Sequence, residues 1–130
     1  MIFVDSNIPM YLVGADHPNK WAAREKLEAL IRRRERLVTD VEVLQEILHR
    51  YVAIDRRDAI QAAVDALDGI VDEIFPMDAL DVARARALLL ERRELSARDA
   101  IHVAIMERQG VSLILTFDRG FDDVPGLTRL

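Results

Sequence analysis

The chain has 130 residues and a formal net charge of −5. Its length fits one domain, residues 1–130, and a hydrophobic content of 51% excludes a disordered chain. Cysteine is absent, which excludes disulfides, zinc–thiolate sites and thiol nucleophiles. No apolar run approaches the ~18 residues that a membrane span needs. No positively charged leader precedes the first apolar stretch, so we expect a cytoplasmic protein without membrane contact.

Short apolar runs alternate with stretches of helical periodicity along the chain. The strands expected from these runs are, in chain order, 2–5, 37–39, 73–76, 113–116 and 127–130. The expected helices cover about 6–13, 20–34, 41–51, 57–70, 78–93 and 96–109. Asp40, Asp78 and Ser96 stand where three of these helices begin and are typical capping residues. The alternation predicts an α/β fold, a parallel sheet covered by helices on both faces.

Four carboxylates stand where such a fold can bring them together. Asp5 and Asp118 lie at or just past the carboxyl ends of two strands, which share one edge of a parallel sheet. Glu46 lies about two turns into the helix after the second strand. Asp99 lies in the first turn of the helix that leads to the fourth strand. If the first and fourth strands are neighbours, all four side chains can face one crevice.

Clustered carboxylates repel one another, so such a site is costly unless a cation fills it. Hard oxygen ligands that leave several coordination positions to water suit Mg²⁺ or Mn²⁺. These ions can activate a water as the nucleophile and stabilise both oxygens of an in-line displacement at phosphorus. The expected chemistry is therefore the hydrolysis of a phosphodiester bond.

Four short motifs around these acids resemble the acidic motifs of PIN-domain nucleases. The motifs are Asp5-Ser6-Asn7, Val43-Leu44-Gln45-Glu46-Ile47-Leu48, Ser96-Ala97-Arg98-Asp99-Ala100 and Thr116-Phe117-Asp118-Arg119-Gly120-Phe121. Within this family the chain is most similar to the VapC toxins of toxin–antitoxin pairs. The resemblance covers essentially the whole chain. It is specific because the four motifs occur in order and at the right spacing, although no single one is specific alone.

The resemblance implies a fold and an activity. The implied fold is a three-layer α/β/α sandwich with a mostly parallel sheet and the strand order 3-2-1-4-5. The implied activity is that of a toxin, an endoribonuclease dependent on Mg²⁺ or Mn²⁺ whose product carries a 5′-phosphate and a 3′-hydroxyl. The residues that match the family's catalytic and metal-binding acids are Asp5, Glu46, Asp99 and Asp118, with Asp122 as a less regular fifth metal ligand.

The resemblance also implies partners. We expect an RNA substrate, a small antitoxin protein and a second copy of the chain in a homodimer. The early helices contain Met10, Tyr11, Leu12 and Trp21, next in sequence to Asp5, and are expected to form the walls of an antitoxin groove. Arg98 and Arg119 adjoin the acids and are candidates for contacts with RNA phosphates.

The acids also have ordinary structural interpretations. Asp5 can cap a helix, the segment from Ser96 to Asp99 resembles a capping box, and Asp118 can begin a turn. For Asp122 and Asp123 two interpretations are equally supported: a place at the edge of the site, or a place in a solvated loop. Glu42 lies one turn before Glu46 and is a weaker candidate on the same side. Family members often have Ser or Thr at the position of Asp40, so the roles of Thr39 and Asp40 stay open.

Two Glu/Asp-x-x-His spacings, Glu46 to His49 and Asp99 to His102, match those of di-iron carboxylate bundles. The strand pattern contradicts a four-helix bundle, so we interpret His102 as a hydrogen-bonded histidine at the edge of the core and His49 as a surface residue. A rival function is a catalytically weak PIN-fold module that binds RNA or protein. The presence of all four acids argues against it. A phosphotransfer receiver domain is also disfavoured, because both lysines, Lys20 and Lys26, lie in an early helix.

Overall fold

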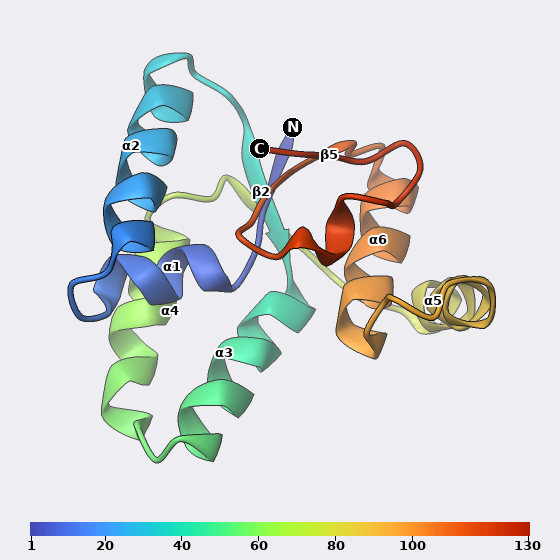
Figure 1. Ribbon diagram of the computed structural model, residues 1–130, viewed down its shortest axis with the longest axis horizontal. Helices are drawn as coiled ribbons and strands as arrows, with labels where there is room; N and C mark the ends of the chain where they lie inside the picture. Colours follow the sequence, from blue (N-terminus) through green and yellow to red (C-terminus); the bar gives the residue numbers. More distant parts are fainter.

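The computed structural model describes all 130 residues. The strands are β1 (Ile2–Val4), β2 (Leu37–Asp40), β3 (Glu73–Phe75), β4 (Leu113–Leu115) and β5 (Thr128–Arg129). The helices are α1 (Asn7–Val13), α2 (Pro18–Arg32), α3 (Val41–Ala53), α4 (Ile60–Asp68), α5 (Ala79–Glu91) and α6 (Ala97–Gln109). Two 3-10 turns are η1 (Arg57–Ala59) and η2 (Arg119–Phe121). Figure 1 shows their arrangement.

The five strands form one sheet in the order β3-β2-β1-β4-β5, and every neighbouring pair is parallel. This confirms the predicted α/β fold and strand order. The central strand β1 pairs through Phe3 with Val38 of β2 and with Ile114 of β4. All three residues of β1 are buried, as expected for a central parallel strand that is covered on both faces.

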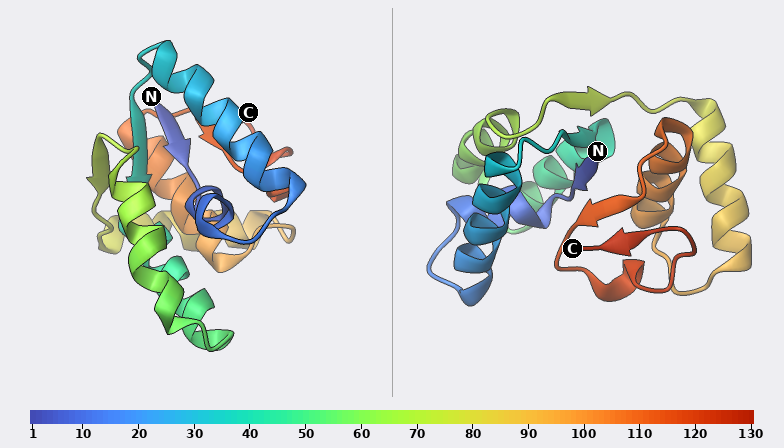
Figure 2. Two further views of the ribbon diagram at one scale, coloured as in Figure 1. Left: turned by 90° about the vertical axis from the view of Figure 1, so that its left-hand side faces the viewer. Right: turned by 90° about the horizontal axis from the view of Figure 1, so that it is seen from above.

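Helices cover the sheet on both sides. Seen from above, α1, α2 and α4 lie on one side of the sheet and α5 and α6 lie on the other (Figure 2). Helix α3 extends from the carboxyl end of β2 and contacts both α4 and α6 (Figure 1). The hydrophobic core is one cluster of 28 buried residues contributed by the sheet and by helices of both layers. The fold is thus the expected three-layer sandwich.

Some element boundaries differ from those expected. Helix α2 begins at Pro18 rather than Lys20, because the His17 ring accepts a hydrogen bond from the Asn19 N–H and proline suits the first helical turn. The helix expected over 57–70 begins as the 3-10 turn η1 and becomes α-helical only at α4. None of the helices is both long and apolar enough to cross a membrane.

The order of the strands defines where a site can form. The chain passes from β1 to β2 on one side, whereas β4 pairs with β1 on its other side. The crevice outside the carboxyl ends of β1 and β4 is therefore a switch point, where doubly wound sheets bind their ligands. Asp5 follows β1 at this point, and Thr116 follows β4.

Candidate active site

Asp5 is held rigidly at the exit of β1. Its side chain is buried, with a relative exposure of 4%. One carboxylate oxygen accepts a hydrogen bond from the Ser6 N–H at 2.7 Å, and the other accepts one from the Thr116 hydroxyl at 2.6 Å. The Asp5 backbone N–H donates to the carbonyl of Leu115 in β4. Burial is the main cause that raises the pKa of the Asp5 carboxyl, and the charge of Glu46 adds to it.

Asn7 links the exits of β1 and β4. Its amide nitrogen donates to the Thr116 hydroxyl oxygen at 2.9 Å and to an Asp5 carboxylate oxygen at 3.3 Å. Its amide oxygen accepts from the Phe117 N–H at 3.2 Å. The Thr116 hydroxyl oxygen also accepts from the Asp118 N–H at 3.0 Å. This network fixes the segment after β4, and with it Asp118, relative to Asp5.

Asp99 and Asp118 approach each other across Gly120. A Cβ atom added to Gly120 would lie 3.1 Å from an oxygen of Asp118 and 3.8 Å from an oxygen of Asp99, so both carboxylates flank this glycine. Burial, followed by the negative charges of Asp118 and Asp5, raises the pKa of Asp99 to about 7. The ion pairs of this region involve Glu42, Glu46 and Asp122 instead. Asp99 and Asp118 are therefore neighbouring acids without a direct ion pair, although the positive charge of His102 lowers the pKa of Asp99 in part.

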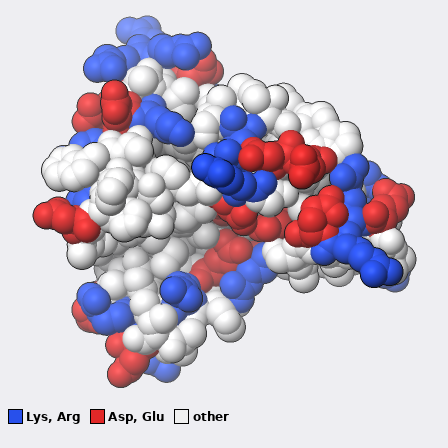
Figure 3. All heavy atoms as spheres, viewed as in Figure 1, with Lys and Arg blue, Asp and Glu red and all other residues white.

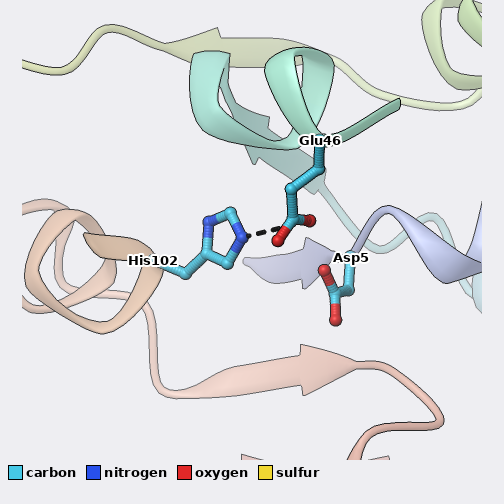
Figure 4. Close-up of side chains that lie close together, drawn as sticks. All are labelled: Asp5, Glu46 and His102. Atoms are coloured by element: carbon cyan, nitrogen blue, oxygen red, sulfur yellow. Dashed lines mark ion pairs between the residues drawn. The ribbon is translucent and has the colours of Figure 1, made fainter. Parts of the chain in front are cut away.

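Glu46 enters the cluster from α3 and faces His102 of α6 (Figure 4). One of its carboxylate oxygens lies 3.5 Å from the Nε2 atom of His102. The other ring nitrogen of His102, Nδ1, lies 2.7 Å from an oxygen of Asp40. The second oxygen of Asp40 accepts from the Val43 N–H and so caps α3. Asp40 and His102 are both fully buried.

The charges of this second group support one another. Burial lowers the pKa of His102, but the hydrogen bond with Asp40 and the nearby carboxylate of Glu46 outweigh burial, and the pKa of His102 lies well above its ordinary value. Burial raises the pKa of Glu46, but the ion pair with His102 outweighs burial, so the pKa of Glu46 is lowered. Glu46 is therefore an ionised carboxylate beside an imidazolium.

The residues of this cluster fit a divalent cation. Asp5, Glu46 and His102 each offer one ligand atom, and these atoms lie within 4.8 Å of one another. Asp99 and Asp118 add further oxygens on the side of Asp5, since both Asp5 and Asp118 raise the pKa of Asp99. Hard oxygen donors with excess negative charge are the chemistry that a divalent cation of the Mg²⁺ or Mn²⁺ type requires.

A pocket of about 590 Å³ lies beside the cluster. Its site end contains Ser6, Asn7 and Glu46, and its remaining walls are Met10, Tyr11, Gly14, Ala15, Asp16, His17, Arg50, Tyr51, Ile54 and Arg98. Figure 3 shows acidic atoms gathered in a hollow between α3 and α6, with basic atoms near its rim. Of the residues expected to form the walls of an antitoxin groove, Met10 and Tyr11 line this pocket, whereas Leu12 and Trp21 do not. Trp21 is instead 56% exposed on α2.

Comparison with known proteins identifies the family to which the chain belongs. The model of the PIN domain matches residues 2–127. The chain belongs to the PIN-domain family. It is 58% identical over 130 residues to Ribonuclease VapC13 of Mycobacterium tuberculosis, which covers 100% of this chain and 99% of that protein. The expected resemblance to VapC proteins is therefore confirmed.

Solved structures agree on the PIN-domain fold. A crystal structure of VapC20 from Mycobacterium tuberculosis, described as a Sarcin-Ricin loop cleaving toxin, is 24% identical with a TM-score of 0.74. The alignment covers 96% of this chain and 95% of VapC20. VapBC2 from Rickettsia felis, solved bound to a DNA fragment from its promoter, is 18% identical with a TM-score of 0.75, covering 100% of this chain and 98% of that one.

The structure brings together the four acids that the sequence singled out in this PIN domain. Asp5, Glu46, Asp99 and Asp118 influence one another electrostatically, and their catalytic role stays a prediction. Asp122 is placed differently, because both of its carboxylate oxygens accept hydrogen bonds from Arg129, at 2.6 and 3.1 Å.

Sequence reasoning missed the surroundings of these acids. His102 was expected at the edge of the core, but it is fully buried between Asp40 and Glu46. His49, at the same spacing from Glu46, is exposed as expected. The available signal was the position of His102 inside the otherwise apolar run from Ala100 to Met106, where a lone polar side chain must find a buried partner.

Proposed function

We propose that this chain is an endoribonuclease that hydrolyses RNA phosphodiester bonds with Mg²⁺ or Mn²⁺, and that it is the toxin of a toxin–antitoxin pair. The observation that carries the proposal is the convergence of Asp5, Glu46, Asp99 and Asp118 at the switch point of the sheet. The name of VapC13, a ribonuclease 58% identical over the whole chain, supports the same activity.

In this proposal the four acids bind the metal, and neighbouring polar residues position them and the RNA. Asp5, Glu46, Asp99 and Asp118 hold the cation, and Glu46 enters the site from α3. The bound ion supplies activation of a water and charge stabilisation at the phosphorus. Asn7 and Thr116 keep Asp5 in place through the hydrogen bonds that join β1 and β4. Arg98 lines the pocket beside Glu46 and is placed to bind a neighbouring phosphate of the RNA strand.

The proposal is tested by cleavage of a mixed RNA pool with the purified protein. Cleavage is expected to stop in excess EDTA and to return when Mn²⁺ is added back. Asp5→Asn serves as the matched inactive variant, because it removes one negative charge while keeping a side chain of the same shape. Undiminished cleavage in excess chelator, or equal cleavage by Asp5→Asn, would contradict a metal-dependent site at these acids.

The antitoxin partner belongs to the same proposal. The pocket offers the apolar side chains of Met10, Tyr11, Tyr51 and Ile54 next to the acidic cluster. A segment that anchors apolar residues there can reach the acids with an Arg or Lys, at the cost of desolvating that cation. Replacing this cation by Ala in a small protein encoded beside the chain should restore some cleavage while binding persists. A complex that leaves the acids open would argue against this arrangement.

The homodimer remains part of the proposal as well. Sedimentation equilibrium of the purified chain measures its oligomeric state directly, and a monomer at micromolar concentration would remove the homodimer without touching the ribonuclease activity.

A further inference from the structure

We propose that His102 is a positioning residue, which holds the Glu46 carboxylate at the metal site while Asp40 orients the imidazole ring. The inference rests on the proposed metal-dependent ribonuclease function. It assigns a role to two buried residues, Asp40 and His102, that lie outside the set of acids expected to bind the metal.

The orientation of the His102 ring is fixed from behind. The Nδ1–H of the His102 ring donates to an Asp40 carboxylate oxygen across 2.7 Å. Asp40 cannot swing away, because its other oxygen caps α3 through the Val43 N–H at 2.8 Å. The Phe3 ring packs against the imidazole, with ring centroids 5.3 Å apart. Because these contacts fix the ring, the Nε2 atom of His102 can point in only one direction.

That direction leads to Glu46. The Nε2 atom is buried and has no hydrogen-bond partner at close range, and a Glu46 oxygen 3.5 Å away is the acid that faces it. Figure 4 shows the ring pointing from α6 toward the Glu46 carboxylate, with Asp5 close by, just after β1. A small movement of the Glu46 side chain converts this ion pair into a charge-assisted hydrogen bond.

Glu46 needs such support. A glutamate side chain has three rotatable bonds, and fixing it costs conformational entropy. Two cations can attract this carboxylate, His102 inside the cluster and Arg98 at the pocket, and both lower the pKa of Glu46. His102 is the rigid one of the two, so it determines which position the carboxylate keeps.

Helix α6 thereby sets the distance between two acids of the site. Asp99 and His102 are three residues apart on α6, a spacing that places both on one face of a helix. Asp99 contributes its own carboxylate, and His102 positions the carboxylate of Glu46 from α3. The arrangement Asp40–His102–Glu46 thus connects the start of α3 to its second turn through a different helix.

Direct ligation of the metal by His102 is the alternative. A ligating histidine usually donates its other ring N–H to a carboxylate, as His102 does to Asp40. Positioning is favoured because the Nε2 atom is covered, whereas the Glu46 side chain retains 14% exposure and lines the pocket. A cation that enters from the pocket meets Glu46 first.

The test uses the full chain and Mn²⁺ as the probe, with binding measured by electron paramagnetic resonance. His102→Phe keeps the ring volume but removes both nitrogens, and it should weaken Mn²⁺ binding roughly 10- to 100-fold, the usual loss when an outer partner of a metal ligand is removed. His102→Gln keeps an N–H that can reach Glu46 and should retain most of the affinity. His49→Gln is the matched control, since His49 is exposed on α3 at the same spacing from Glu46, and it should bind like wild type.

A second arm separates positioning from general structural damage. Because His102 acts through Glu46, His102→Phe should add little further loss of Mn²⁺ affinity in a Glu46→Gln background. In the otherwise unaltered chain His102→Phe should lower kcat for RNA and leave KM nearly unchanged. If His102→Phe does not fold, Asp40→Asn replaces it, since an asparagine oxygen can still cap α3. Asp40→Asn should weaken Mn²⁺ binding although Asp40 does not touch the ion.

Three outcomes would overturn the inference. Additive losses in the Glu46→Gln background would show that His102 does not act through Glu46. Wild-type affinity in both His102→Phe and Asp40→Asn would show that neither residue positions a ligand. Nitrogen coupling from an imidazole in the spin-echo spectrum of bound Mn²⁺, lost in His102→Gln, would make His102 a ligand instead. Wild-type protein that binds Mn²⁺ but does not cleave RNA would contradict the ribonuclease proposal and leave the positioning role standing.

Discussion

The first turns of the neighbouring helices α5 and α6 contain the same local pattern with opposite electrostatic outcomes. In α5, Asp78 caps the helix and Asp81 completes a capping box, and Arg108 binds both oxygens of Asp81 at 2.7 and 2.8 Å. In α6, Ser96 caps the helix and Asp99 occupies the same third position. The hydrogen bonds from Arg108 lower the pKa of Asp81, whereas burial and the neighbouring acids raise the pKa of Asp99 to about 7.

The difference shows what separates a structural acid from a site acid. Both stand near a helix N-terminus, where the dipole favours a carboxylate. Asp81 is then neutralised by Arg108, which lies near the end of α6, while Asp99 at the start of the same helix has no ion-pair partner, and the charges of Asp118 and Asp5 outweigh that of His102. A capping acid that lacks a cation and faces other acids is costly to the fold, which indicates that a ligand supplies the missing charge.

The largest effect expected from this contrast is on activity. Asp99→Asn should lower RNA cleavage by more than about 100-fold, because removal of outer partners of a metal ligand already costs up to that amount. Asp81→Asn should cleave near the wild-type rate, since Asp81 lies in the capping box of α5 and not in the acidic cluster. Initial rates on one RNA substrate at saturating Mn²⁺ measure both. Equal losses in the two variants would remove the distinction.

For stability we expect the larger loss in Asp81→Asn and little or no loss in Asp99→Asn. Asp81→Asn should reduce the free energy of unfolding by about 2 kcal/mol, because it weakens two charge-assisted hydrogen bonds of a carboxylate that is 2% exposed. Asp99→Asn should leave the metal-free protein equally or more stable, since it removes like-charge repulsion. Urea denaturation in EDTA gives both values. An Asp99→Asn protein that unfolds well below wild type would make Asp99 a structural residue.

The smallest effect concerns pH. The pKa of Asp99 is raised to about 7 in the folded protein, so its contribution to stability is fully present below its ordinary value of 3.8 and is lost as pH rises through 7. The pKa of Asp81 is lowered, so its contribution is present above 3.8 and is lost only as pH falls through the folded value.

Metal-free wild type should therefore lose stability from about pH 4 to pH 7 relative to Asp99→Asn. Asp81→Asn should run parallel to wild type over the same range. Denaturant midpoints at intervals across this range compare the three proteins, and the comparison with Asp99→Asn separates Asp99 from His102, whose raised pKa also favours the folded state at lower pH. Parallel curves for wild type and Asp99→Asn would show that Asp99 does not titrate as the structure implies.

Much of the fold could be predicted because its signals are local. The run Ile2-Phe3-Val4 is apolar throughout because β1 is buried on both faces, and it ends at the polar Asp5 where the strand leaves the sheet. Asp40, Asp78 and Ser96 each cap a helix as their side chains suggested. The strand order came from the resemblance to PIN domains, because short apolar runs do not specify their neighbours.

The site was predictable only in part for a related reason. The acids belong to motifs with a recognisable order, but their partners are chosen by tertiary contact. The sequence predicts that Asp40 caps a helix, and the structure confirms it. No local pattern shows that the second oxygen of Asp40 binds His102, which lies 62 residues further along the chain. His49 and His102 have the same spacing to an acid, and only burial distinguishes them. The Arg108 that neutralises Asp81 is likewise 27 residues away.

The dispersal of the acidic cluster over Asp5, Glu46, Asp99 and Asp118 has a consequence during synthesis of the protein. The cluster needs β1 paired with β4, and β4 is synthesised after all six helices. Until Asp118 emerges, the growing chain contains acids but no crevice that joins them. The site can therefore form only after β4 has been synthesised and has paired with β1, so the order of the chain makes assembly of the acidic cluster one of the last steps of folding.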